Sequence, residues 1–285
     1  MIRDEPTLFM FLIQNLNCTS KKFGTLVLAL FSTFALHAQS TDLSGIAHVA
    51  LRANDLAKSR DFYGRLGLEQ AFEFTDAGKT SVAFIKVNDR QFIELYPRTT
   101  DSQPGGLLHI CFEANDVESV RRAYLKRELE PAEIKKARAG NLLFVVHDPE
   151  GQLLEYTQYL PESLHSRDHG KHIGAHRISG HLLEATSAVK DIAAERAFYT
   201  TKLDFRSASP LGAEFFIAGH SSEKVMLQPQ TPPAGPRISF GVTSVRKTAR
   251  ELRARGFQVQ ASRLSVSVVD PDGAILSFVS TRDPR

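Results

Sequence analysis

The alternation of apolar and polar residues after residue 43 predicts a βαβββ unit. Residues 44–52 alternate as expected for a half-buried strand. A helix is predicted over 56–66, where Asn54 and Asp55 cap its start and Gly67 ends it. Three further strands complete the unit, at about 68–74, 80–87 and 91–97.

The same order of elements is then predicted a second time. A strand that begins at Gly106 leads into a helix over 117–129. Strands are expected near 132–137, 142–147 and 152–158. The segment Asp148-Pro-Glu-Gly151 supplies the last hairpin turn, with proline at its second position and glycine at its fourth.

From Ile178 the pattern restarts. Residues 188–199 resemble 53–63, and Asp270-Pro-Asp-Gly273 repeats the earlier turn. Internal repeats of this kind predict an α+β fold of two tandem domains, each a pair of βαβββ units that form a cupped or barrel-like antiparallel sheet. The predicted segments are an export signal at 1–40, a first domain at 41–160, a linker at 161–177 and a second domain at 178–285.

Composition narrows the classes of partner. The 285 residues suffice for two domains, and 42% hydrophobic residues suffice for their cores. The net charge of +3, from 35 basic and 32 acidic residues, argues against nucleic acid as a partner. The two cysteines, Cys18 and Cys111, do not suggest a disulfide framework.

The first 40 residues have the features of an export signal. Lys21 and Lys22 precede an apolar run that ends at Ala38, where cleavage is expected. The run is short for a membrane span, so the mature protein is expected in the periplasm or outside the cell, with no membrane attachment. Because acidic residues precede Lys21, an uncleaved anchor or a start at Met10 are the alternatives.

Four polar residues interrupt apolar strands and are the candidate site. A single histidine in a strand is usually a core residue, and His109 alone would be interpreted that way. Ligand-type residues on four strands together indicate a metal site. They are His48, Glu94, His109 and Glu155.

The linker carries four more histidines, at 165, 169, 172 and 176. Their spacing would suit one face of a helix, but Gly170 and Gly174 interrupt it. A solvated connector is therefore expected, with a second metal site as the alternative.

Several of these motifs together resemble the vicinal oxygen chelate superfamily, which includes glyoxalase I, extradiol dioxygenases and bleomycin-resistance proteins. They are His-Val-Ala-Leu at 48–51, Ile-Glu-Leu at 93–95, Leu-His-Ile-Cys-Phe at 108–112, and Asp-Pro-Glu-Gly followed by Leu-Glu-Tyr at 148–156. The resemblance is strong over 44–160 and weaker over 178–282. It implies a fold more specifically than a reaction.

The resemblance also implies a ligand set. In this family the ligands come from the first and last strands of each βαβββ unit, which gives His48, Glu94, His109 and Glu155 here. The set is similar to that of bacterial glyoxalase I, and its subset without Glu94 is similar to the iron triad of extradiol dioxygenases. One divalent ion is expected, Fe, Mn, Ni, Co or Zn.

The second domain is expected to be metal-free. Aligned by register, its four equivalent positions contain no histidine: Glu184, Met226, Arg237 and Ser277. A complete ligand set is therefore expected only if the first domain closes on itself, or if it pairs with the first domain of another chain in a homodimer.

The favoured function is a metal-dependent lyase or isomerase of glyoxalase type. Its small substrate would chelate through neighbouring oxygens, and Glu94 or Glu155 would accept a proton. The alternatives are an Fe(II) extradiol-type dioxygenase and a binding or resistance protein without turnover. Candidate additional acid-base groups are Tyr96, Tyr156 and His147, although strand packing is the favoured interpretation of these three residues.

Overall fold

A computed structural model describes residues 43–100, 103, 105–208, 212–217, 222–230 and 235–281. The expected export signal at 1–40 lies outside these residues. Within the described part of the chain, no helix has both the length and the apolar character needed to cross a membrane.

The first module is one eight-stranded sheet with the order β2-β3-β4-β1-β5-β8-β7-β6. Its strands are β1 (Leu43–Ala53), β2 (Glu69–Asp76), β3 (Lys79–Lys86), β4 (Phe92–Pro97), β5 (Gly106–Ala114), β6 (Lys135–Lys136), β7 (Leu142–His147) and β8 (Leu153–Gln158). Its helices are α1 (Leu56–Arg65) and α2 (Val117–Lys126). A short helix, α3 (Leu164–Arg167), follows the sheet.

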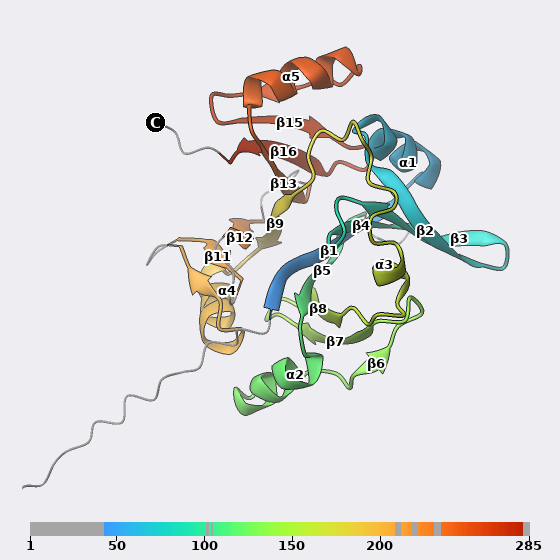
Figure 1. The fold of residues 1–285 in the computed structure, drawn as a ribbon. Coiled ribbons are helices and arrows are strands. Elements are labelled where there is room, and N and C mark those ends of the chain that lie inside the picture. The colour runs from blue at the N-terminus through green and yellow to red at the C-terminus, as the bar shows by residue number, and fades with distance from the viewer. Residues whose placement is uncertain are drawn as a thin grey trace, which may run out of the picture. The chain divides into compact units, whose positions relative to one another are not determined.

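The second module repeats this arrangement with the order β10-β11-β12-β9-β13-β16-β15-β14. Its strands are β9 (Leu182–Val189), β10 (Arg206–Ser207), β11 (Glu214–Phe216), β12 (Lys224–Pro229), β13 (Arg237–Val242), β14 (Gln260–Ala261), β15 (Ser265–Val269) and β16 (Ile275–Ser280). Its helices are α4 (Ile192–Ala197), the π-helical turn η1 (Phe198–Lys202) and α5 (Val245–Ala254). The predicted fold class, two tandem domains with paired βαβββ units, is confirmed (Figure 1).

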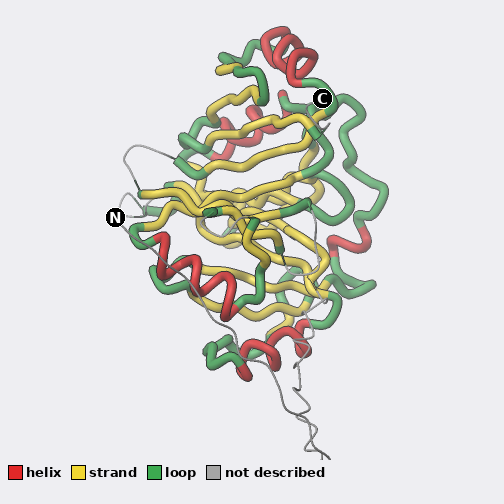
Figure 2. The backbone as a smooth tube through the Cα atoms, turned by 90° about the vertical axis from the view of Figure 1, so that its left-hand side faces the viewer, coloured by secondary structure: helices red, strands yellow, loops and turns green. Residues whose placement is uncertain are grey.

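In each sheet, the two βαβββ units of one module pair with each other. In the first module β1 pairs in parallel with β4 and antiparallel with β5, so it joins the two βαβββ units. The parallel β1–β4 and β5–β8 pairs arise because a helical crossover separates the first strand of each unit from the rest. Figure 2 shows the strands side by side across the interior, with helices around them.

The helices begin where their caps predict. Asp55 accepts hydrogen bonds from the backbone N–H groups of Ala57 and Lys58, both at 3.1 Å. Asp116 does the same for the first turn of α2. These carboxylates satisfy amides that have no partner inside the helix, and they fix the point where each strand turns into its helix.

Strand alternation separates a helix-covered face from a concave face. On β1, Val49 and Leu51 face the core under the helices, whereas His48 and Ala50 face the concave side. The main core continues into the second module, since the rings of Phe62 and Phe257 meet edge to face at 5.2 Å. The concave face can therefore carry polar chemistry without interrupting the core.

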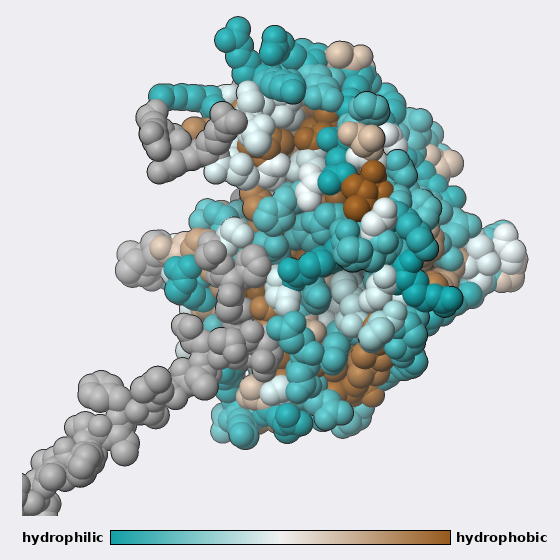
Figure 3. Space-filling view, in the orientation of Figure 1, coloured by the Kyte–Doolittle hydropathy of each residue, from teal (hydrophilic) through white to brown (hydrophobic). Residues whose placement is uncertain are grey.

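The face of the molecule shown in Figure 3 is mostly hydrophilic, with separate apolar patches. Large exposed hydrophobic side chains among the described residues are Leu125, Leu264 and Val269. They belong to α2 and to the region of β15.

Most of residues 161–177, the segment between the modules, are exposed or half-buried, but part of the segment packs against the first module. Ser163, His165 and Asp168 are buried. The buried ammonium of Lys86 explains this, because it draws the segment against β3 through an ion pair with Asp168 at 2.8 Å. The linker histidines also do not share a helix face, since α3 is only four residues long.

Candidate metal centre

The four predicted ligands come from four adjacent strands at the centre of the first sheet, β4, β1, β5 and β8. Glu94 and His109 both lie opposite Ala50 in register, one on each side of β1. Because Ala50 has a small side chain and faces the same side as His48, the longer side chains beside it can converge above the strand.

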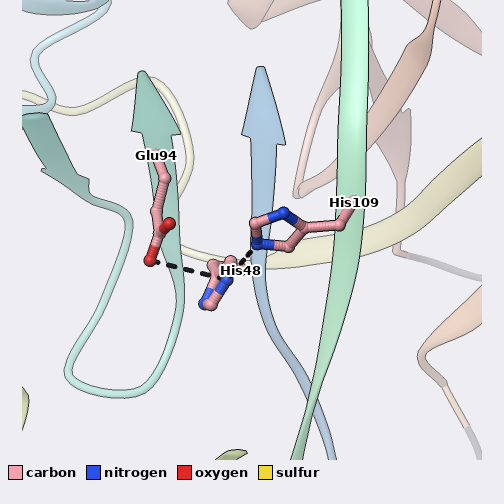
Figure 4. A group of neighbouring side chains, drawn as sticks. All are labelled: His48, Glu94 and His109. Atoms are coloured by element: carbon pink, nitrogen blue, oxygen red, sulfur yellow. Dashed lines mark hydrogen bonds and ion pairs between the residues drawn. The ribbon is translucent and has the colours of Figure 1, made fainter. Parts of the chain in front are cut away.

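The structure brings three of these residues into close contact (Figure 4). His48 Nε2 lies 2.9 Å from His109 Nε2 and 3.4 Å from Glu94 Oε1. One ligand atom from each lies within 4.8 Å of the other two. They point toward one another from β1, β4 and β5.

Glu155, the fourth predicted ligand, lies beside this group. Its Oε1 is 3.6 Å from His48 Nε2, and it forms a second potential metal-binding group with His48 and Cys111. Its side chain is 12% exposed, against 6% for Glu94. Glu155 is thus the more accessible of the two carboxylates.

Two further residues belong to the site. The Cys111 thiol donates to Glu155 Oε1 at 3.4 Å, and the Tyr96 hydroxyl donates to Glu94 Oε2 at 2.8 Å. The sequence contains a signal for Cys111, since it lies two residues after His109 and therefore on the same strand face.

The other two acid-base candidates do not reach the site. Tyr156 lies in the core, where its ring stacks on Phe144 at 5.0 Å. His147, at the end of β7, is exposed. For these two residues, packing and solvent exposure are the better interpretation.

Burial governs the protonation of the cluster. It lowers the pKa of His48 well below its usual value, with a further contribution from His109, and it lowers the pKa of His109 to about 4. Burial, with a further contribution from Glu155, raises the pKa of Glu94 to about 8. Burial also raises the pKa of Glu155 to about 7, against the hydrogen bond from Cys111.

These residues fit a divalent cation. Without a cation, the surrounding protein favours neutral imidazoles and a protonated Glu94. The charge of a bound cation would instead favour the ionised carboxylate of Glu94. Metal–ligand bonds of about 2.1 Å at right angles would place neighbouring ligand atoms about 3 Å apart. The measured separations of 2.9, 3.4 and 3.6 Å from His48 are close to this value. Nitrogen and oxygen ligands suit Fe, Mn, Ni, Co or Zn.

The second sheet repeats the register with different residues. Thr186 pairs with Met226 on one side and Arg237 on the other. These two positions correspond to Glu94 and His109 of the first sheet. A thioether and a guanidinium therefore take the places of two ligands.

Positively charged side chains lie in the equivalent region of the second sheet. Lys224 Nζ lies 3.6 Å from Glu184 Oε2, and Arg237 donates to the Ser277 hydroxyl at 2.9 Å. Among the described residues, both groups that could hold a metal ion lie in the first module.

The candidate metal centre opens into a pocket of about 450 Å³ on the concave face. Its polar lining includes His48, Glu94 and Glu155 of the candidate metal centre, together with Asp76, Ser81, Arg138 and Asn141. Its apolar walls include Phe74, Val82, Phe84 and Leu143. A pocket of this size accepts a small organic molecule and covers it largely with apolar surface.

Comparison with known proteins supports this description. Residues 45–156 match the Glyoxalase/Bleomycin resistance protein/Dioxygenase superfamily. No curated protein matches the chain in sequence.

Three solved structures illustrate the likeness. The Mn(II)-bound glyoxalase from Novosphingobium aromaticivorans is 18% identical, with a TM-score of 0.65 over 85% of this chain and 83% of that one. The 2,3-dioxygenase LapB from Pseudomonas sp. KL28 is 15% identical, with a TM-score of 0.63 over 86% and 96%. Homoprotocatechuate 2,3-dioxygenase from Arthrobacter globiformis is 17% identical, with a TM-score of 0.62 over 86% and 83%.

The resemblance predicted from the sequence is therefore confirmed: the chain has the vicinal oxygen chelate fold, and the superfamily model matches its residues 45–156. At these identities the structural likeness establishes the fold, not the reaction.

Proposed function

We propose that the chain is a divalent-metal-dependent enzyme whose small substrate chelates through two neighbouring oxygens, with glyoxalase-like isomerase or lyase chemistry. The observation that carries this proposal is the convergence of His48, Glu94 and His109 within 4.8 Å, with His48 and Glu94 lining a pocket of about 450 Å³. Such a cluster in a concave site is typical of a metal-dependent active site.

The proposed ligands are His48, Glu94, His109 and Glu155, and the metal is Fe, Mn, Ni, Co or Zn. A divalent cation bound there would supply a Lewis acid, which polarises two neighbouring oxygens and acidifies a C–H bond beside a carbonyl. The chain's own residues then determine where the substrate lies and which group accepts the proton.

Glu155 is the better candidate for the proton acceptor. It faces the pocket and is more exposed than Glu94, whose Oε2 is held by Tyr96. A carboxylate at the edge of the ligand set can accept a proton from one substrate carbon and return it to its neighbour. Glu94, fixed by Tyr96, would serve mainly to orient the site.

An Fe(II) extradiol-type dioxygenase is the second candidate. The aromatic walls of the pocket, Phe74 and Phe84, favour it because they would pack well against a planar ring. The position of Glu94 counts against it, since a fourth protein ligand leaves fewer places for a catechol and oxygen together. A binding protein that retains its ligand without turnover is the third candidate.

The test is turnover by the untagged, metal-loaded protein. Small dicarbonyl and hydroxycarbonyl compounds would be assayed, with and without added thiol, beside catechols in air. If residues 1–40 direct export, as their sequence predicts, turnover should not require glutathione. Isomerised product supports the proposal, ring-cleaved product supports the second candidate, and tight binding without product supports the third.

A further inference from the structure

The thiol of Cys111 is a potential metal ligand that the proposed function does not use. Cys111 lies on β5, two residues after His109 and on the same face of the strand. It is fully buried, and its Sγ lies 3.4 Å from Glu155 Oε1. A cysteine that only fills space as a small apolar side chain does not need a carboxylate beside it, so packing alone does not account for this contact.

The register of the sheet places His48, Cys111 and Glu155 in one row across three strands. Cys111 lies opposite His48 on the β1 side and opposite Glu155 on the β8 side. Residues that are paired in this way share one face of the sheet. Glu94 and His109 belong to the neighbouring row, two residues along β1. Two three-residue groups therefore overlap at the candidate metal centre, and both contain His48.

The spacing of the group with Cys111 suits tetrahedral coordination. An ion with bonds of about 2.1 Å to nitrogen and oxygen and about 2.3 Å to sulfur would place tetrahedral ligand atoms about 3.4 to 3.6 Å apart. Glu155 Oε1 lies 3.6 Å from His48 Nε2 and 3.4 Å from Cys111 Sγ. The 2.9 Å between the ring nitrogens of His48 and His109 corresponds instead to ligands at right angles. The two groups therefore suit different coordination geometries.

A cation can approach this group from the pocket. His48 and Glu155 line the pocket of about 450 Å³, and the Glu155 side chain is 12% exposed. Cys111 lies behind them in the sheet. The ion would pass the Glu155 carboxylate, and the pocket would supply a water molecule as its fourth ligand.

The second module has the same row of positions without a thiol. Ser239 takes the place of Cys111, and its hydroxyl donates to Glu184 Oε1 at 3.0 Å. On its other side Ser239 pairs with Ser277. A serine therefore fits this place in the sheet and keeps a hydrogen bond to a carboxylate, but it lacks the soft sulfur ligand. Cys111→Ser is thus a conservative substitution that removes only the thiol.

We propose that His48, Cys111 and Glu155 form a second cation site, which overlaps the candidate metal centre and binds a thiophilic divalent cation. On binding, the cation forms a bond to the Cys111 sulfur, and the thiol proton passes to solvent. Because His48 and Glu155 are shared, the two sites cannot be filled together, and a thiophilic cation would displace the ion of the proposed centre. An ion without a preference for sulfur would favour the proposed centre, which offers four nitrogen and oxygen ligands. This site does not depend on the proposed reaction.

The test is a titration of the full-length protein, stripped of metal, with Cd²⁺. The ultraviolet charge-transfer band of a cadmium–thiolate bond reports directly on sulfur ligation. Every protein carries Cys18→Ser, so that Cys111 is the only cysteine in the chain. The proteins compared are this background, Cys111→Ser and His109→Ala. Competition with a chelator of known affinity gives the Kd of each protein for Cd²⁺ and for Mn²⁺.

We expect the thiolate band to saturate at one equivalent of Cd²⁺ in the background protein and in His109→Ala, and to be absent from Cys111→Ser. Cys111→Ser should bind Cd²⁺ at least about 10-fold more weakly, since even partners outside a ligand set have effects of that size. It should bind Mn²⁺ within about 2-fold of the background, because Mn²⁺ prefers oxygen and nitrogen ligands. Retained Mn²⁺ affinity also shows that the variant is folded around the candidate metal centre.

Absence of the band in the background protein, or a band that persists in Cys111→Ser, would overturn the inference. So would an equal loss of Cd²⁺ and Mn²⁺ affinity in Cys111→Ser, because a structural role of Cys111 would weaken both ions alike. A background protein that shows the band but retains no Fe, Mn, Ni, Co or Zn after reconstitution would contradict the proposed function and support this second site.

Discussion

Ala50 shows how a single residue shapes the candidate metal centre. It lies on β1 between Glu94 and His109 in register, fully buried under their side chains. A larger residue at this position would fill the space in which the imidazoles and carboxylates meet. The same register in the second sheet has Thr186, flanked by residues that are not metal ligands.

Tyr96 donates a hydrogen bond to Glu94, one of the proposed ligands, and the effect of its hydroxyl on metal binding can be tested. We predict that Tyr96→Phe lowers metal affinity by about 10-fold, because Glu94 loses the hydrogen bond that orients it. A competition titration with a chelator of known affinity measures the change.

Tyr199→Phe is the matched control for Tyr96→Phe. Tyr199 is buried in the second module, and its hydroxyl has no hydrogen-bond partner in the structure. The metal affinity of the Tyr199→Phe variant should equal that of wild type. If both variants retained wild-type affinity, Tyr96 would have no role in orienting Glu94.

The sequence predicted which polar side chains lie together better than it predicted their neighbours. Polar residues in apolar strands pointed to His48, Glu94 and His109, because the two-residue period of a strand places each side chain on a known face. The sequence pattern did not distinguish Tyr96, which lies at the site, from Tyr156, which lies in the core. Both are aromatic residues in apolar strands, and only the three-dimensional pairing shows which face each one occupies.

At the scale of elements, Lys86 anchors the segment that carries α3. We predict that Lys86→Met destabilises the fold by about 3–5 kcal/mol, because removal of the buried ammonium leaves the carboxylates of Asp89 and Asp168 facing each other without a cation. Thermal unfolding should show a fall in Tm of roughly 5–15 °C.

Lys58→Met provides the comparison. Lys58 forms an exposed ion pair with Asp55 at 3.4 Å, so its loss should leave Tm unchanged. A Lys86→Met protein as stable as Lys58→Met would contradict the role given to the buried cluster.

The sequence predicted the regular elements but not this segment. Asp55 and Asp116 marked the helix starts because a cap is a local interaction. The packing of residues 161–177 against the first module depends instead on Lys86, which lies some 80 residues earlier in the chain. Lys86 itself was a hint, since a lysine in the predicted strand 80–87 needs a partner if it is buried.

At the scale of the whole molecule, acidic groups meet where the two modules touch. Glu195 of the second module accepts a hydrogen bond from the backbone of Glu150 in the first, at 3.2 Å. Burial, together with nearby Asp148, Glu150 and Asp191, raises the pKa of Glu195 to about 7. The folded state therefore favours the protonated form of the Glu195 carboxyl.

The sign of the resulting pH dependence follows from this shift. In the unfolded chain Glu195 has an ordinary pKa of about 4.3. The contribution of protonated Glu195 to the free energy of unfolding is therefore fully present below that pH, and it is lost as the pH rises toward 7. We predict that Glu195→Gln unfolds several degrees higher than wild type at pH 8 and at about the same temperature at pH 4. Calorimetry at both values measures the difference.

Glu118→Gln should show no such pH-dependent gain, because Glu118 is exposed on α2. A Glu195→Gln protein that gained nothing at pH 8 would show that the raised pKa has no effect on stability.

The partner of β5 could not be read from the sequence. The ligand register required the two βαβββ units of the first module to pair with each other or with those of another chain, and both satisfied the hydrophobic pattern. In the structure of the single chain, β1 pairs with β5 of the same module. A homodimer through another surface stays a prediction.

The most direct test of the account is the metal content of three untagged proteins: wild type, His109→Ala and His147→Ala. His109 is a proposed ligand, whereas His147 is an exposed histidine on strand β7 of the same sheet. Elemental analysis should find about one Fe, Mn, Ni, Co or Zn ion per chain in wild type and His147→Ala, and almost none in folded His109→Ala. Equal metal in all three proteins, or none in wild type after reconstitution, would contradict the proposed metal centre.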